Sequence, residues 1–427
     1  MRRCPRKKNG KTSLLLSVLA QQGYTEVVKA LFLTNEYPPN IYGGAGVHVD
    51  YLSRELAKLM PVEVRCFGSQ DIVGKSLTVK GFGLDTSGFS CPANLKSALG
   101  AIRRCTDFNT TAIDAQIVHC HTWYTHFGGI LAKLNYGTPL VITIHSLEPL
   151  RPWKREQLGR GYDFSSWIEK TAIELADAII AVSEETKRDV LQLFDVDPAR
   201  IRIIYNGIEP AEYCKTDSTQ ALVKYGIDPS VPYVLFVGRI ARQKGIVHLV
   251  NAIKYFDPGF QVVLCAGAPD TPEIAEEMKT AVEAARLHRD GIFWVEQMVP
   301  KSEAIEFYSN AAVFCCPSIY EPFGIINLEA MACETAVVAS AVGGIKEVVV
   351  DGETGYLVAL EQMTESPYEP IDSDKFARDL AAPINVLMAD PAKREAFGRA
   401  GRKRAIEKFS WSAIAAGTKT LYEELLK

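Results

Sequence analysis

The sequence lacks both a long hydrophobic run and an excess of charge of one sign. No apolar stretch reaches the ~18 residues that a membrane-spanning helix needs. The formal net charge is −4, with no sustained basic or acidic block beyond the first few residues. A dedicated nucleic-acid-binding protein should carry a basic stripe. We therefore expect neither a membrane span nor nucleic-acid binding, and a phosphorylated substrate would have to be held by a few placed cations.

The C-x-x-C spacing of many metal and redox sites is also missing, although the chain has ten cysteines. Cys120, Cys265 and Cys333 lie inside apolar runs, and Cys315 and Cys316 are adjacent. This usage predicts reduced, buried thiols in a cytoplasmic protein, without a disulfide framework.

The first 28 residues imitate two targeting or binding motifs without completing either. A basic run precedes a short apolar run that ends at Ala20, as in a signal peptide, but two glutamines follow and the cleavage pattern is poor. The segment NGKTS resembles a phosphate-binding loop, but Pro5 stands where its first glycine is required. We interpret residues 1–28 as a basic leader or an over-extended start.

Apolar, β-branched runs alternate with helical segments along the rest of the chain. The expected strands are KALFLTNEY, VEVRCFGS, AQIVHCHTW, PLVITIHSL, AIIAVS and IRIIYNGI, then YVLFVGRI, QVVLCAGA, GIFWVEQM, AAVFCCPS, TAVVASAVGG and GYLV. Strands without polar alternation are buried on both faces, which predicts parallel sheets covered by helices and an α/β class of the doubly wound type.

A polar, turn-rich stretch separates the two sets of strands and marks the domain boundary. We expect a Rossmann-like domain over residues 29–225, a second over 226–405, and a closing C-terminal helix over 406–427. Two such domains bind ligands at the carboxyl ends of their strands, so the cleft between them is the expected site.

Three glycines open the first helix after the first expected strand. Gly43, Gly44 and Gly46 would let the backbone approach a phosphate at a helix N-terminus, or would only supply a flexible turn. A dinucleotide fingerprint is disfavoured because its third glycine is missing.

Two cations follow the strand YVLFVGRI. Arg239 and Lys244 stand five residues apart before a helix, a pattern typical of a diphosphate clamp, with a solvated surface pair as the alternative.

A histidine and a polar loop follow the strand PLVITIHSL. His145 ends this strand at the expected cleft, where it could be functional or structural. Glu148, Arg151 and Lys154 come next and could bind an acceptor or face solvent.

Two features suggest a metal ion, and we disfavour both. We expect His119 and His121 to project from opposite faces of their strand, which would make joint ligation awkward. Asp195 and Asp197 resemble a metal-binding acid pair, but they precede a strand and therefore lie at the wrong edge of the sheet, where a turn explains them better.

Two acids, Glu321 and Glu329, stand eight positions apart in YEPFGIINLEAMA. The segment follows an expected strand and runs into a helix, so Glu321 should lie at the cleft. Gly324, Ile325 and Ile326 should then offer backbone N–H groups at the helix N-terminus. We expect Glu329 about two helical turns along from Glu321.

These segments together resemble those of the retaining GT-B glycosyltransferases with an E-x7-E motif. The segments are EYPPNIYGGAGVHV, HTWYT, IHSLEPLRPWKREQLG, VGRIARQKG, LCAGAPDTPE, YEPFGIINLEAMAC and VVASAVGGIKEVV. The likeness covers residues 29–427 and is greatest to the actinobacterial-type glycogen synthases, also described as α-maltose-1-phosphate synthases. The resemblance implies two Rossmann-like domains facing across a cleft.

The resemblance also implies roles for the residues of the two clusters on the second domain. Arg239 and Lys244 would neutralise the diphosphate of the donor. Glu321 would contact hydroxyl groups of the donor sugar, and Glu329 would bind the ribose of the nucleotide. The two acids would then each bind hydroxyl groups of one donor molecule and would not act as an acid/base pair.

The remaining implied roles belong to backbone groups and to the first domain. Gly324, Ile325 and Ile326 would hold phosphate and sugar through their backbone. Gly43 and Gly44 would close from the other domain, and His145 would stand near the reacting face of the sugar.

The implied reaction is the transfer of glucose from a nucleotide-glucose, ADP-glucose by preference, with formation of α-1,4 links in glycogen biosynthesis. The acceptor is a glucan end or glucose 1-phosphate, whose phosphate Arg151 and Lys154 would bind. No metal or other cofactor is implied, and a homodimer remains open. Asn40, Ile41 and Tyr42 precede the glycine pair where classical bacterial glycogen synthases carry a lysine, a departure that favours the actinobacterial-type subgroup.

Three alternatives stay open. One is a retaining transferase of the same fold that moves mannose, N-acetylglucosamine or glucose to another acceptor. A nucleotide-sugar epimerase or a glucan phosphorylase would have a similar architecture, although a phosphorylase needs a longer chain and a lysine for pyridoxal phosphate. A non-catalytic carbohydrate-binding protein would not need the full set of cations and acids.

Overall fold

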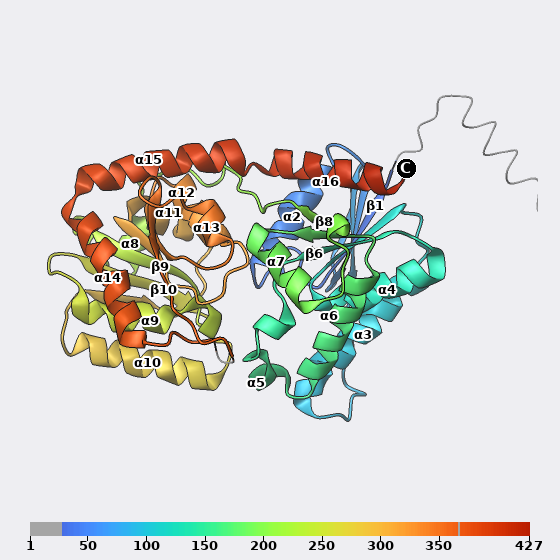
Figure 1. Ribbon diagram of the computed structural model, residues 1–427, viewed down its shortest axis with the longest axis horizontal. Helices are drawn as coiled ribbons and strands as arrows, with labels where there is room; N and C mark the ends of the chain where they lie inside the picture. The colour runs from blue at the N-terminus through green and yellow to red at the C-terminus, as the bar shows by residue number, and fades with distance from the viewer. Residues whose placement is uncertain (1–27, 366–367) are drawn as a thin grey trace, which may run out of the picture.

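The computed structural model describes residues 28–365 and 368–427, and it folds into two α/β units that lie side by side (Figure 1). Our interpretations of the leader, the signal-like run and the NGKTS segment concern residues outside these ranges.

Each unit is built on one sheet. The first sheet has the strand order β3-β4-β2-β1-β5-β6-β7-β8 and the second has the order β11-β10-β9-β12-β13-β14. The strands of the first sheet are β1 (Ala30–Thr34), β2 (Val62–Phe67), β3 (Asp71–Val73), β4 (Leu77–Phe82), β5 (Ile117–His121), β6 (Leu140–Ile144), β7 (Ala178–Ala181) and β8 (Ile201–Ile203). Those of the second are β9 (Tyr233–Arg239), β10 (Gln261–Gly267), β11 (Ile292–Val295), β12 (Val313–Cys316), β13 (Ala336–Ser340) and β14 (Gly355–Val358).

Helices cover both faces of each sheet. Those of the first unit are α2 (Gly44–Leu56), α3 (Ala93–Thr110), α4 (Trp123–Tyr136), α5 (Lys154–Leu158), α6 (Gly161–Leu175) and α7 (Glu184–Leu193). The later helices are α8 (Gln220–Lys224), α9 (Ile246–Ala252), α10 (Pro272–Arg286), α11 (Lys301–Asn310), α12 (Ile325–Ala332), α13 (Ile345–Val348), α14 (Ser373–Ala389), α15 (Pro391–Lys408) and α16 (Trp411–Leu425). Two doubly wound sheets confirm the predicted GT-B architecture.

All twelve strands expected from apolar runs form, and nearly all pairings are parallel. Every residue of β1, β5, β6, β10 and β13 is buried, as strands covered on both faces must be. The apolar pattern missed β3 and β4, which pair antiparallel at the edge of the first sheet. The residues of β3 are exposed, so this strand needed no apolar run.

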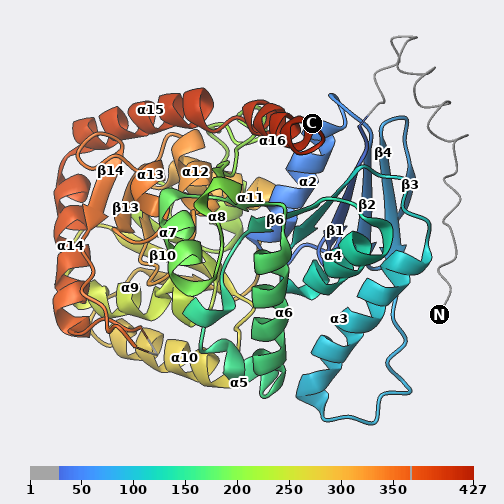
Figure 2. The same ribbon diagram turned by 45° about the vertical axis from the view of Figure 1, so that its right-hand side comes forward.

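The C-terminal helix returns to the first unit. In both views α15 lies along the second unit and α16 continues toward the first, where it packs on α2 (Figures 1 and 2). Trp411 at the start of α16 is buried in the same apolar cluster as Val49 and Leu52 of α2. The chain therefore crosses between the units twice.

The cysteines and the helices of this fold bear on two expectations from composition. Cys120, Cys265 and Cys333 are buried and unpaired, as predicted. Within the described ranges, none of the helices is both long and apolar enough to cross a membrane.

Candidate active site

The order of the strands reverses beside β1 in the first sheet and beside β9 in the second. Ligands of doubly wound sheets bind outside the carboxyl ends of the strands at such a point. The segments after β1, β6, β9 and β12 carry most of the predicted site residues, and contacts between the two units join them.

The glycine-rich segment after β1 meets α12 across the cleft. Gly43 precedes α2 and Gly44 is its first residue, as predicted. A Cβ atom at Gly44 would lie 3.6 Å from Cδ1 of Ile325, so this segment touches the start of α12. Glu36 accepts hydrogen bonds from the N–H groups of Tyr42 and Gly43, both at 2.8 Å. Glu36 therefore occupies the N–H group of Gly43, one of the backbone donors that were expected to face a phosphate.

The loop after β12 brings Glu321 to the cleft, where it is 8% exposed. Gly324 precedes α12 with φ +93°, a left-handed conformation that glycine adopts without a steric penalty. The N–H groups of Ile325 and Ile326 form the N-terminus of this helix, as expected. Glu321 itself lies in the loop ahead of the helix, so only Glu329 of the two acids is helical.

The two predicted cations lie in the cleft, and each is paired with a carboxylate. Lys244 Nζ lies 2.5 Å from Oε2 of Glu321. Arg239 pairs with Asp270 and donates to the hydroxyl of Tyr42 at 2.9 Å, with its guanidinium over the Tyr42 ring. The side chains of Arg239 and Lys244 are 13% and 16% exposed, so neither is a solvated surface cation.

Asp270 is one of the residues of this site that the sequence did not predict, as are His48, Tyr213 and Tyr308. It follows β10, whose end lies beside the end of β9, and its side chain is 6% exposed. It accepts from Tyr42 of the other unit, and Lys154 Nζ lies 3.7 Å from its Oδ2 atom. Its position after a strand next to β9 was the available signal, because strand ends share one edge of a parallel sheet.

Glu329 is enclosed by two tyrosines. The Tyr213 hydroxyl donates to Oε1 and the Tyr308 hydroxyl donates to Oε2, both at 2.9 Å. Burial raises the pKa of Glu329, and the two hydroxyl donors oppose that rise. The tyrosines therefore favour the ionised carboxylate and fix its direction.

The loop after β6 does not face solvent. Glu148 is 2% exposed and accepts from the Ser165 hydroxyl, so it lies beneath the loop. Arg151 Nη1 lies 3.5 Å from Glu148 and donates to Ser146 at 2.8 Å. Burial and the neighbouring Arg151 lower the pKa of Lys154 to about 8. Lys154 thus stands beside Asp270, with the charges of Arg151 and Arg239 near it, whereas Glu148 pairs with Arg151.

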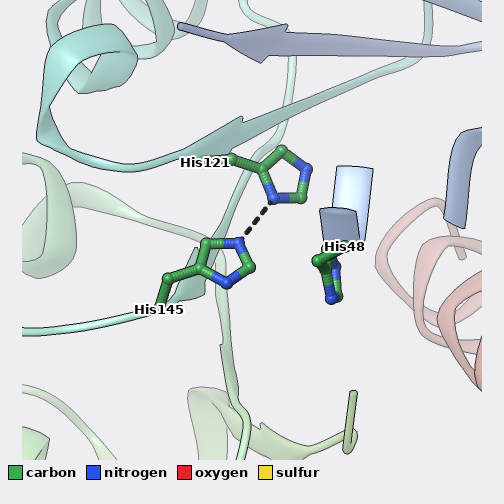
Figure 3. Close-up of side chains that lie close together, drawn as sticks. All are labelled: His48, His121 and His145. Carbon is green, nitrogen blue, oxygen red and sulfur yellow. Dashed lines mark hydrogen bonds between the residues drawn. The ribbon is translucent and has the colours of Figure 1, made fainter. Parts of the chain in front are cut away.

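Our expectation about the two histidines of β5 was wrong. Residues two apart on a strand share a face, and the rings of His119 and His121 lie 4.2 Å apart on the same side of the sheet. His145 follows β6, the neighbouring strand, and its Nε2 lies 3.1 Å from Nδ1 of His121 (Figure 3). His48 of α2 completes the group, with its ring 4.7 Å from that of His145.

His48, His121 and His145 could in principle hold a metal ion. Each offers one ring nitrogen, and these atoms lie within 4.8 Å of one another. Burial lowers the pKa of all three rings, to about 4 for His48, which favours the neutral form that ligates metals. Asp195 and Asp197 take no part, because Asp197 caps a short helical turn before β8.

Comparisons with known proteins agree with this geometry. Residues 42–212 match the family model described as Glycosyltransferase Family 4, and residues 217–366 match the one described as Glycosyl transferases group 1. The chain is 47% identical over 408 residues to the alpha-maltose-1-phosphate synthase of Mycolicibacterium smegmatis, which covers 93% of this chain and 100% of that protein. The protein of the same name from Mycobacterium tuberculosis is 45% identical over 404 residues, with the same coverage.

A solved structure shares the arrangement of the two units. The sucrose-phosphate synthase of Thermosynechococcus elongatus superposes with a TM-score of 0.75 and 25% identity, covering 93% of this chain and 99% of that one. The chain therefore belongs to the family of GT-B glycosyltransferases that contains the alpha-maltose-1-phosphate synthases, and it is a hexosyltransferase.

Proposed function

We propose that this hexosyltransferase transfers glucose from a nucleotide-glucose, ADP-glucose by preference, to glucose 1-phosphate. The product is maltose 1-phosphate, a precursor for glycogen, with an α-1,4 link and retained configuration; a glucan end is the other acceptor. The name of the 47% identical relative supports this acceptor.

The observation that carries the proposal is the convergence of cations from both units around Asp270. Arg239 comes from the second unit, and Lys154 comes from the first, with Arg151 beside it. Two phosphorylated substrates have to meet in one cleft during this reaction, and the donor's diphosphate and the acceptor's phosphate both need such groups. Asp270 pairs with these cations, and a substrate phosphate would take its place as their anionic partner.

On the donor side, three kinds of group stabilise the leaving diphosphate. Arg239 supplies a forked contact, Lys244 a point charge, and the N–H groups at the start of α12 supply positive potential. Glu321 orients Lys244 at 2.5 Å and is available to hydroxyl groups of the donor sugar. Glu329 binds the ribose with the lone pairs that the two tyrosines leave free.

The proposed bond change needs no base from the protein. The acceptor hydroxyl attacks the anomeric carbon from the face that the diphosphate leaves, and the departing phosphate oxygen takes the hydroxyl proton. The bond from the anomeric carbon to the diphosphate breaks as the new glycosidic bond forms. Protein cations, rather than a divalent ion, stabilise the leaving group in this scheme.

The test offers the protein four pairs of substrates: ADP-glucose or UDP-glucose with glucose 1-phosphate or glycogen. We expect a disaccharide phosphate from ADP-glucose and glucose 1-phosphate, identified by mass and by an α-anomeric proton in its NMR spectrum. A β-linked product would contradict retention. Failure to glucosylate either acceptor would remove the proposal and favour another hexose donor or acceptor.

A further inference from the structure

Four histidines, His48, His119, His121 and His145, lie with their rings close together, and two of them make a hydrogen bond that the reaction scheme above does not use. His121 is completely buried, and His145 is only partly buried. The contact joins Nδ1 of His121 to Nε2 of His145 at 3.1 Å (Figure 3). One of the two rings must donate in this bond, and the choice fixes which nitrogen of His145 carries a proton.

Burial favours the neutral form of both rings, and a neutral imidazole carries one proton. Burial, with the neighbouring histidines, lowers the pKa of His121 and of His145 well below the usual range. His121 packs against Phe32, His119 and His48, and among the described residues only burial and other histidines shift its pKa. A neutral imidazole has one donor nitrogen and one acceptor nitrogen.

Two arrangements satisfy these limits. In the first, Nδ1–H of His121 donates to Nε2 of His145, whose own proton then lies on Nδ1. In the second, Nε2–H of His145 donates to Nδ1 of His121, whose proton then lies on Nε2.

The surroundings of His121 distinguish the two arrangements. Its Nε2 atom is buried and has no hydrogen-bond partner among the described residues. A proton there would be an orphaned buried donor, which folded proteins rarely tolerate, whereas an unused acceptor is less costly. In the first arrangement neither proton is an orphaned buried donor. The proton on Nδ1 of His121 is used in the hydrogen bond to His145. The proton on Nδ1 of His145 lies on the side of the ring away from His121 (Figure 3), and this atom is not among the buried atoms without a partner.

We propose that His121 is a positioning residue that holds His145 in the tautomer with its proton on Nδ1. His145 then carries an N–H donor on the side of its ring away from His121, suited to an oxygen atom of the donor sugar. The tautomer rests on the burial and the hydrogen bonds of the two rings, whereas its use toward a sugar oxygen rests on the proposed function.

Imidazole nitrogen NMR tests the tautomer directly. The full chain would be labelled with ¹⁵N only in its seven histidine rings, and the signal of His145 would be assigned from its loss in His145→Gln. We expect Nδ1 of His145 to give a protonated, pyrrole-type shift and Nε2 an unprotonated one. The opposite pattern in the wild-type protein would overturn the proposal, as would metal-bound shifts with stoichiometric zinc released on denaturation.

Two substitutions test the part played by His121. His121→Ala removes the donor, and we expect His145 to lose its single tautomer and turnover to fall about tenfold, the loss of one hydrogen-bonded positioning contact. The affinity for ADP should stay unchanged because no sugar is present. His121→Asn places an amide N–H near the lost Nδ1 and should restore both the shift pattern and most of the turnover.

A buried histidine outside the pair provides the control. His126 is also buried, and neither of its ring nitrogens has a partner among the described residues. His126→Ala should alter stability and leave the signals of His145 in place. Equal disturbance of His145 by both alanine variants would show a packing effect and overturn the positioning role. A correct tautomer in a protein without glucosyl transfer would reject only the proposed function.

Discussion

At the scale of single residues, the site is a set of charges that already have partners. Arg239 pairs with Asp270, Lys244 with Glu321, and the two oxygens of Glu329 accept from two tyrosines. Such pairing removes the cost of isolated buried charge and holds each group in one direction. A substrate phosphate therefore has to compete with an internal carboxylate for Arg239.

Removal of either donor-side cation should slow turnover. We expect Arg239→Ala and Lys244→Ala each to lower kcat about tenfold to a hundredfold, because hydrogen bonds to charged groups contribute roughly 1.5–3 kcal/mol. Initial rates with saturating donor measure the effect. Arg399→Ala is the matched control, since its side chain is 65% exposed and pairs within one helix. Wild-type turnover in both site variants would reject their assignment to the diphosphate.

Lys154 should make acceptor use dependent on pH. With its pKa lowered to about 8, its ammonium loses its proton as the pH rises from 7 to 9.5. We expect kcat/KM for glucose 1-phosphate to fall through this range. In Lys154→Met, kcat/KM should be low throughout and should not change with pH. Lys170→Met, at an exposed pair on α6, should keep the wild-type profile.

The effect of Lys154 on folding stability has the opposite dependence on pH, because stability should increase as the pH rises. Burial penalises its ammonium, so the penalty is fully present below pH 8 and shrinks as the pH rises from 8 toward the ordinary value of 10.5. If the protein unfolded at pH 9 and activity fell with it, the binding role of Lys154 would be contradicted. Circular dichroism at each pH separates loss of activity from unfolding.

At the scale of elements, the start of α12 depends on one backbone conformation. Gly324 has φ +93°, and a Cβ atom there would lie 2.6 Å from Nδ2 of Asn327. The same turn begins α12, whose first N–H groups belong to Ile325 and Ile326. If the proposed donor site is correct, the stability of this turn and the strength of donor binding both depend on Gly324.

Gly324→Ala should weaken both properties. We expect a loss of about 1–2 kcal/mol in the free energy of unfolding, the cost of a side chain in a left-handed conformation, and a higher KM for the nucleotide-glucose. Urea unfolding and initial rates measure the two effects. Gly417→Ala lies in α16 with open space around it and should be neutral or stabilising. An unchanged KM in Gly324→Ala would separate the turn from donor binding.

At the scale of the whole molecule, α16 ties the second unit to the first. Trp411 is buried, its ring is stacked on Tyr51 at 5.6 Å, and it lies 5.4 Å from the ring of His48. Tyr51 also receives a hydrogen bond from Lys301 of the second unit. One aromatic cluster thus links the closing helix, the helix after the glycine-rich segment, and the opposite domain.

Trp411→Ala should therefore destabilise more than its own helix. We expect a loss of about 3–5 kcal/mol in the free energy of unfolding, the range for truncating a large buried aromatic side chain. Denaturant unfolding followed by fluorescence and by activity measures it. Trp167→Ala, at a ring that is 55% exposed, should cost less than about 1 kcal/mol. Equal losses in the two variants would contradict the central place of Trp411.

The sequence predicted the twelve apolar strands, the two-domain architecture and most positions at the cleft. A strand that is buried on both faces appears in the sequence as an apolar run, whereas the exposed strand β3 does not. The error over His119 and His121 was one of geometry, because residues two apart on a strand share a face. Asp270 was missed since its partner Arg239 lies 31 residues away and only the pairing of β9 with β10 brings them together.

By itself the sequence determined which residues stand at strand ends, and hence at one edge of each sheet, because parallel strands align their carboxyl ends. Only the tertiary structure decided how those residues pair. His121 meets His145, Tyr42 meets Arg239, and Tyr213 meets Glu329 across separations of 24, 197 and 116 residues. These contacts depend on the placement of two domains and on side-chain directions, which no local pattern of residues records.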